Sequence, residues 1–86
     1  MTERLVTRTG KDINGDITSL CNHAEYWSPR MKHNAINDIE LGIHKYYTLS
    51  GSIKTYVRVV NGPTGKYLRT DSDTTTRNNL DDLPNC

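Results

Sequence analysis

The chain has 86 residues, of which 34% are hydrophobic and 24% charged, and its formal net charge at pH 7 is +1. That length supports one small hydrophobic core, so we expect a single domain over residues 1–86. The apolar runs are too short to cross a bilayer, and the first residues lack the apolar segment of a signal peptide, so we expect no membrane association.

The charges and the cysteines are unevenly placed along the chain. Residues 45–70 contain five basic residues and no acidic residue, whereas residues 71–86 carry a formal charge of −3. Two cysteines, Cys21 and Cys86, are fewer than a small secreted domain usually carries. We therefore expect free thiols and a reducing, cytoplasmic location.

The first quarter of the chain has the pattern of a β-hairpin. Residues 4–9 contain a Leu-Val pair among threonines, and residues 17–21 are again extended in character. The Asn14-Gly15 pair between them favours a tight turn. We expect two antiparallel strands here.

A helix is predicted over residues 29–41. Ser28 can accept a hydrogen bond from a free backbone N–H as the N-cap, and Pro29 suits the first helical position. Gly42 is placed to end the helix in the left-handed conformation. The apolar side chains of this segment fall on one face of the helix: Met31, Ala35, Ile36 and Ile39.

Three strands are predicted after the helix. Residues 44–49 and 53–60 are rich in β-branched and aromatic residues and flank a Ser-Gly-Ser loop at residues 50–52. Residues 61–65, with the sequence Asn-Gly-Pro-Thr-Gly, predict a tight turn. This turn leads into a last strand over residues 66–70.

The predicted fold class is α+β, with the element order β-β-α-β-β-β. Because the connections are short, we expect mostly antiparallel neighbours, with one amphipathic helix packed on one face of the sheet in a two-layer domain. Residues 71–86 are rich in Asp, Ser, Thr and Asn. We expect them to form an irregular tail that is held on the domain by Leu80 and Leu83.

The segment Gly-Pro-Thr-Gly-Lys at residues 62–66 has some features of a phosphate-binding loop. A P-loop, however, needs glycine at position 60 and Ser or Thr at position 67, where this chain has Val60 and Tyr67. It also needs a helix after the lysine, and the GXXG loop of KH domains needs helical flanks. We therefore interpret the segment as a turn.

Motifs for metal binding and catalysis are weak. The possible zinc ligands lack Cys-x-x-Cys or His-x-x-x-His spacing, and the acidic residues Asp71 and Asp73 lack the glycine and glutamate of a calcium loop. Neither cysteine can be paired from the sequence with a histidine and an orienting acid. We expect no cofactor, no metal site and no enzymatic activity. The zinc ligands considered are Cys21, His23, His33 and His44.

Alternation along the strands predicts a basic, aromatic sheet face. If Ile53, Val57 and Val59 contact the helix, then the residues between them face away. On the last strand, an inward Leu68 places its neighbours Tyr67 and Arg69 outward. On the strand over residues 44–49, inward Tyr47 and Leu49 place Tyr46 outward. Including Lys66 after the turn, the candidate binding residues are Tyr46, Lys54, Tyr56, Arg58, Lys66, Tyr67 and Arg69.

Such a face is compatible with several roles. Aromatic rings among cations can stack nucleic-acid bases and neutralise phosphates. The same residues can also form an ordinary solvated sheet face, be covered by the acidic tail 71–86, or pair with a second copy of the chain. We expect an interaction module with a protein partner or a homodimer, with single-stranded nucleic acid as the alternative.

The chain also carries short motifs whose combination is specific: Trp27-Ser28-Pro29, Asp38-Ile39-Glu40-x-Gly42, Tyr46-Tyr47, Gly62-Pro63-x-Gly65-Lys66-Tyr67-Leu68-Arg69-Thr70 and Asn78-Asn79-Leu80-x-x-Leu83-Pro84. With these motifs the chain resembles the small bacterial proteins grouped as DUF3892, a domain of unknown function. The resemblance covers nearly the whole chain. It implies a compact, stand-alone bacterial domain, but no particular activity, cofactor or site residue.

Overall fold

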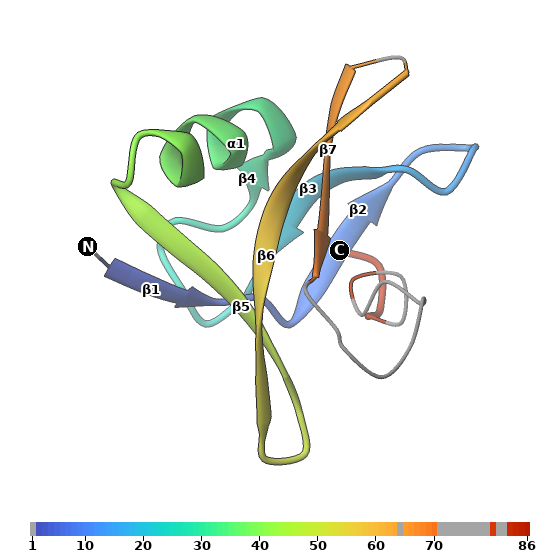
Figure 1. The fold of residues 1–86 in the computed structure, drawn as a ribbon. Coiled ribbons are helices and arrows are strands. Elements are labelled where there is room, and N and C mark those ends of the chain that lie inside the picture. The colour runs from blue at the N-terminus through green and yellow to red at the C-terminus, as the bar shows by residue number, and fades with distance from the viewer. Residues whose placement is uncertain (1, 64, 71–79, 81–82) are drawn as a thin grey trace.

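The helix and strands follow one another in the predicted order, with two additional short strands (Figure 1). The computed structural model describes residues 2–63, 65–70, 80 and 83–86. The predicted α+β class is confirmed, because one helix is combined with strands that are mostly antiparallel. Most of the predicted irregular tail, namely residues 71–79 and 81–82, lies outside the described residues.

The larger sheet has the strand order β1-β5-β6-β7. It consists of β1 (Thr2–Leu5), β5 (His44–Ser50), β6 (Ile53–Gly62) and β7 (Gly65–Thr70). The β5–β6 and β6–β7 pairs are antiparallel hairpins, whereas β1 pairs with β5 in parallel. In Figure 1, β6 runs the length of this sheet, with β5 beside its first half and β7 beside its second half.

The smaller sheet consists of β2 (Arg8–Lys11), β3 (Ile17–Cys21) and β4 (Arg30–Met31), all antiparallel. The single strand predicted over residues 4–9 is therefore divided between the two sheets. The backbone N–H of Val6 donates to Tyr47 in the larger sheet, and that of Thr7 donates to Cys21 in the smaller one. These two hydrogen bonds mark where the chain crosses from one sheet to the other.

The helix α1 spans Lys32–Glu40 and begins later than predicted. Met31 is its N-cap, with an extended backbone and no side-chain cap. Ser28 is not the cap, because its hydroxyl accepts the backbone N–H of Asn22 at 2.9 Å. The N-terminal boundary is displaced because residues 30–31 pair with β3 as strand β4 instead of joining the helix.

The predicted end of the helix is confirmed at Gly42, whose φ is 70°. The N–H of Gly42 donates to the carbonyl of Ile39 at 3.2 Å, and that of Ile43 donates to the carbonyl of Asp38 at 2.9 Å. This pair of bonds is the Schellman motif, which satisfies carbonyls at the helix C-terminus and favours glycine at this position.

The hydrophobic core joins the helix to both sheets, since α1 contacts strands of each. From the predicted apolar face of the helix, Ala35 and Ile36 are buried and Ile39 packs against the core, but Met31 is 47% exposed. Leu83 also packs against the core cluster. That cluster consists of Val6, Ile17, Leu20, Ala35, Ile36, Tyr46, Val57, Leu68 and Leu80.

Cys21 and Cys86 form a disulfide, so the prediction of free thiols is wrong. The pairing is possible because the last residues lie beside β2: Thr9 donates its N–H to Pro84 and accepts one from Cys86. The disulfide removes the support that free thiols gave to a cytoplasmic location. No helix among the described residues is long and apolar enough to cross a membrane.

Candidate functional site

The larger sheet has one face toward the core and a second face directed away from it, which we call the outer face. Residues that are paired across adjacent strands share a face, and the face alternates along each strand. The registers Glu3↔Lys45, Tyr47↔Tyr56 and Arg58↔Arg69 therefore connect all four strands. The polar and aromatic residues of the outer face are Glu3, Lys45, Tyr47, Lys54, Tyr56, Arg58, Tyr67 and Arg69.

Tyr46 does not lie on the outer face, contrary to the prediction. It is fully buried, and its hydroxyl donates to Asp38 Oδ2 at 2.6 Å and accepts from Arg4 Nη1 at 3.0 Å. Its ring packs edge-to-face against Trp27, with 5.7 Å between centroids. A tyrosine can be buried when its hydroxyl finds partners, and here both a donor and an acceptor lie within reach. Tyr47 takes the outward position instead.

Two lysines lie over the tyrosine rings of the outer face. The rings of Tyr47 and Tyr56 meet edge-to-face, with 6.4 Å between centroids. Lys54 Nζ lies 4.4 Å from the Tyr47 centroid and 5.2 Å from the Tyr56 centroid. Lys45 Nζ also lies 5.2 Å from the Tyr56 centroid. Cation–π attraction therefore holds the ammonium groups against the rings.

Glu3 adds a carboxylate to a face that was predicted from an acid-free part of the chain. It forms an ion pair with Lys54, and its Oε2 accepts a hydrogen bond from the Tyr56 hydroxyl at 3.0 Å. The hydrogen bonds from Lys54 and Tyr56 lower the pKa of Glu3, and the bond to the carboxylate raises the pKa of Lys54. Sequence reasoning missed Glu3 because it is 51 residues from Lys54 and arrives through a parallel pairing.

The far end of the outer face carries Tyr67, which is 40% exposed. A Cβ added to Gly62 would lie 3.0 Å from Cδ1 and Cε1 of the Tyr67 ring, so the ring lies close to the glycine backbone. Arg58 and Arg69 are direct cross-strand partners beside this end. The pairing of β6 with β7 therefore places Tyr67 and Arg69 on the same face as Arg58.

Lys66 lies on the core-facing side of β7, on the same side as Leu68. Its Nζ is 2.8 Å from Glu40 Oε2, at the end of α1. Two of the predicted binding residues, Tyr46 and Lys66, therefore fall on the core-facing side of the sheet. The structure brings the other five together on the outer face: Lys54, Tyr56, Arg58, Tyr67 and Arg69.

A buried charged network lies beneath the sheet, and sequence reasoning did not predict it. Asp38 is 4% exposed, and its two carboxylate oxygens accept from Arg30 Nε and Nη2, each at 2.9 Å. Burial alone would raise the pKa of Asp38, but the hydrogen bonds from Arg30 and Tyr46 outweigh it and lower the pKa. Burial and the bond to Asp38 raise the pKa of Tyr46.

Arg4 extends this network to β1 and to His44. Its guanidinium lies 5.4 Å from the Trp27 centroid, and its Nη2 is 3.1 Å from Nε2 of His44. Because a guanidinium only donates, His44 Nε2 must accept, which places the ring proton of a neutral His44 on Nδ1. Among the described residues, His44 Nδ1 and Arg4 Nε are buried without a hydrogen-bond partner.

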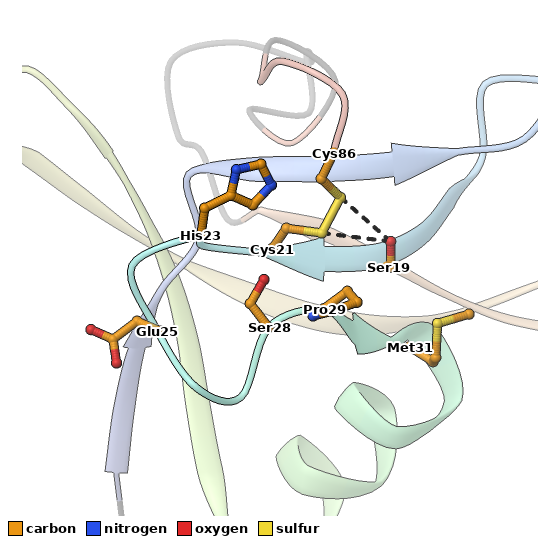
Figure 2. A pocket seen from close by; sticks show the side chains of 8 residues that line it. All are labelled: Ser19, Cys21, His23, Glu25, Ser28, Pro29, Met31 and Cys86. Carbon is orange, nitrogen blue, oxygen red and sulfur yellow. Dashed lines mark hydrogen bonds between the residues drawn. A yellow bond between two sulfur atoms is a disulfide. The ribbon is translucent and has the colours of Figure 1, made fainter.

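Two cavities open beside these elements. One, of about 300 Å³, lies where β5 and β6 separate, and it is lined by Ile39, His44, Lys45, Tyr56 and Val57. The other, of about 410 Å³, lies beside the disulfide (Figure 2). Its lining includes Ser19, Cys21, His23, Glu25, Ser28 and Cys86.

The zinc ligands considered from the sequence are not brought together. The Cys21 sulfur is engaged in the disulfide and so is not a thiolate ligand. In the part of the chain that the structure describes, no three His, Cys, Asp or Glu side chains are grouped closely enough to hold a metal ion. Asp71 and Asp73, considered for calcium, lie outside the described residues.

Comparisons with known proteins identify a family. A search of curated proteins and a search of solved structures each returned no significant match. The family model described as "Protein of unknown function (DUF3892)" matches residues 6–84, which agrees with the resemblance carried by the sequence motifs. The chain therefore belongs to the DUF3892 family, whose function is unknown.

Proposed function

We propose that this protein is a non-enzymatic binding module whose outer face holds an acidic, partly apolar segment of a partner protein. The observation that carries the proposal is the strip of tyrosines and cations that crosses β5, β6 and β7. Its described charged side chains are four cations and the carboxylate of Glu3, and no acidic residue lies within positions 45–70 of the chain. The cations are Lys45, Lys54, Arg58 and Arg69.

The apolar part of the strip supports the same partner. Tyr56 and Tyr67 are 36% and 40% exposed, and Leu49, which follows Tyr47 on the same side of β5, is 48% exposed. Tyrosine and arginine are enriched among the residues that dominate binding energy at protein interfaces. An acidic segment with apolar side chains is attracted by the basic strip and can cover these apolar groups at the same time.

Single-stranded nucleic acid fits this face less well. Base stacking needs an accessible ring face, and the ammonium of Lys54 already lies over Tyr47 and Tyr56. A face-to-face homodimer would bring the cations of two copies together, which like-charge repulsion disfavours.

Amide chemical-shift mapping of ¹⁵N-labelled protein tests the proposal with three titrations. The probes are a synthetic peptide of alternating Glu and Leu, an oligothymidylate of equal charge, and the protein itself over a concentration series. We expect the peptide to shift amides around Tyr47, Tyr56 and Tyr67, and its affinity to fall with added salt because charge pairs are screened. Tighter binding of the oligothymidylate, or shifts from self-association alone, would overturn the proposal.

A matched pair of variants separates this face from general charge effects. Lys45→Gln and Lys66→Gln each remove one positive charge, but from opposite sides of the sheet. We expect Lys45→Gln to weaken peptide binding about three- to tenfold and Lys66→Gln to change it by less than about twofold. Equal effects of the two variants would show that the peptide responds to net charge and not to the outer face.

A further inference from the structure

The Cys21–Cys86 disulfide lies at the wall of the 410 Å³ cavity (Figure 2), and its two cysteine residues differ in exposure. Cys21 is 2% exposed on β3, whereas Cys86 is exposed. Thiol–disulfide exchange begins when a thiolate reaches one sulfur, and the other sulfur then leaves as a thiolate. A thiolate from solvent reaches the exposed residue more readily, so the difference in exposure favours attack at Cys86 and departure of Cys21.

The surroundings of the disulfide suit that leaving group. The hydroxyl of Ser19, itself 8% exposed, lies 3.9 Å from Cys21 Sγ and 3.7 Å from Cys86 Sγ. It can donate to the negative charge that develops on Cys21, and hydrogen bonds to charged acceptors are stronger than neutral ones. A Cβ at Gly10 would lie 2.3 Å from this hydroxyl, so glycine at that position leaves Ser19 the space it occupies.

We propose that the folded protein undergoes thiol–disulfide exchange with a low-molecular-weight thiol at Cys86. The thiol loses its proton to solvent, and its sulfur attacks Cys86 Sγ. The bond to Cys21 breaks, and Cys21 leaves with the electron pair and then takes up a proton. The products are a mixed disulfide at Cys86 and a free Cys21 thiol. A second thiol molecule attacks the mixed disulfide, which releases the Cys86 thiol and a disulfide of the small thiol.

The exchange would loosen the segment that covers the edge of β2. Thr9 exchanges backbone hydrogen bonds with Pro84 and Cys86 at 3.0 and 3.1 Å, and Lys11 Nζ donates to the carbonyl of Leu83 at 3.1 Å. Once the covalent link is broken, non-covalent contacts such as these hydrogen bonds and the packing of Leu83 on the core retain the segment. The site is on the smaller sheet, so the inference is independent of binding at the outer face.

The test treats oxidised, folded protein with 2-mercaptoethanol, stops the reaction with acid, and maps the adduct by mass spectrometry of peptides. We expect the adduct on Cys86 and a free thiol on Cys21. The Ser19→Ala variant should react about three- to tenfold more slowly, the size of effect expected for one lost hydrogen bond. An adduct found mainly on Cys21, or an unchanged rate in Ser19→Ala, would contradict the proposed exchange.

A purely structural disulfide would react through the unfolded chain, and a second comparison detects that route. Val57→Ala removes buried volume from β6 in the larger sheet and so raises the unfolded fraction. We expect its exchange rate to stay within about twofold of the parent rate, because attack occurs in the folded state. A rate that rises with the unfolded fraction, either in this variant or in urea below the unfolding transition, would refute attack on the folded protein.

Discussion

The side chain of Asp38 connects three elements of the fold. Its carboxylate accepts hydrogen bonds from Arg30 on β4 and from Tyr46 on β5, while its own backbone belongs to α1. The guanidinium of Arg30 contacts both carboxylate oxygens of Asp38. Such a bidentate pair is stronger than a single hydrogen bond and fixes the relative orientation of the two side chains. The buried carboxylate therefore fixes the position of the helix on the larger sheet.

Replacing Asp38 should destabilise the fold strongly. We expect Asp38→Asn to lower the free energy of unfolding by about 2–3 kcal/mol, because it leaves the buried Tyr46 hydroxyl and the partly exposed Arg30 without a charged partner. Glu40→Gln is the matched control on the same helix, since its ion pair with Lys66 is solvent-exposed, and it should change stability by less than about 1 kcal/mol. Urea unfolding measures both, and equal losses would contradict a special role of Asp38.

The contribution of Asp38 to the free energy of unfolding depends on pH, because the pKa of its carboxyl group is lowered in the folded state. Protons bind more readily to the unfolded chain, so the stability from Asp38 is fully present above its ordinary pKa of 3.8. That stability is lost as pH falls below this value and through the lowered pKa of the folded state. The difference in stability between the parent protein and Asp38→Asn should therefore shrink in acid, and a constant difference would argue against ionisation of Asp38.

Among the elements, the β6–β7 hairpin has two glycines that perform different tasks. Gly65 has a φ of 128°, and among the described residues no heavy atom beyond its chain neighbours lies within 4 Å of the position that a Cβ would take there. Gly62 has instead the Tyr67 ring close to its backbone. Gly65 is required by its backbone conformation, whereas Gly62 is required by the Tyr67 side chain that packs across it.

Alanine at each position should separate these tasks. Gly65→Ala should cost about 1–2 kcal/mol of unfolding free energy, because alanine is strained at that φ. Gly62→Ala should change stability by less than about 1 kcal/mol but displace the Tyr67 ring, which proton NMR of the ring detects. If Gly62→Ala leaves the ring signals in place, the close contact at this glycine does not position Tyr67.

For the whole molecule, the disulfide connects residues that are 65 positions apart in the chain. Closing so long a loop restricts the unfolded chain considerably. We expect the Cys21→Ser, Cys86→Ser double variant to lose about 2–4 kcal/mol of unfolding free energy. Thermal or urea unfolding measures the loss, and the parent protein unfolded in a reducing buffer is the control. If the double variant were as stable as the oxidised parent protein, the disulfide would contribute nothing to the free energy of unfolding.

Sequence patterns correctly predicted those parts of the fold that depend on interactions between residues close together in the chain. The helix end at Gly42, the β5–β6 and β6–β7 hairpins and the alternation along β6 from Thr55 to Val59 depend on neighbouring residues, and each could be predicted from the sequence. Ile53, which the alternation predicts to contact the helix, is instead 67% exposed. The helix start could not be predicted, because the capping preference of Ser28 competes with pairing of residues 30–31 to β3.

The errors at the candidate site have a common cause in distant contacts. Tyr46 and Tyr47 are adjacent, so alternation alone permits either one to be buried, and only Asp38 and Arg4 decide that it is Tyr46. Glu3 and the disulfide likewise depend on pairings between residues far apart in the chain. A single sequence has no local signal for such pairings.

The parallel pairing of β1 with β5 has a consequence for the order in which the chain can fold. Thr2 is paired with His44, so β1 has no partner in the larger sheet until about half of the chain has been synthesised. The hairpins of β5, β6 and β7 are local and carry little loop-closure cost, whereas adding β1 closes a long loop. We therefore expect β1 to join last, and the Arg4 guanidinium to be buried in that final step.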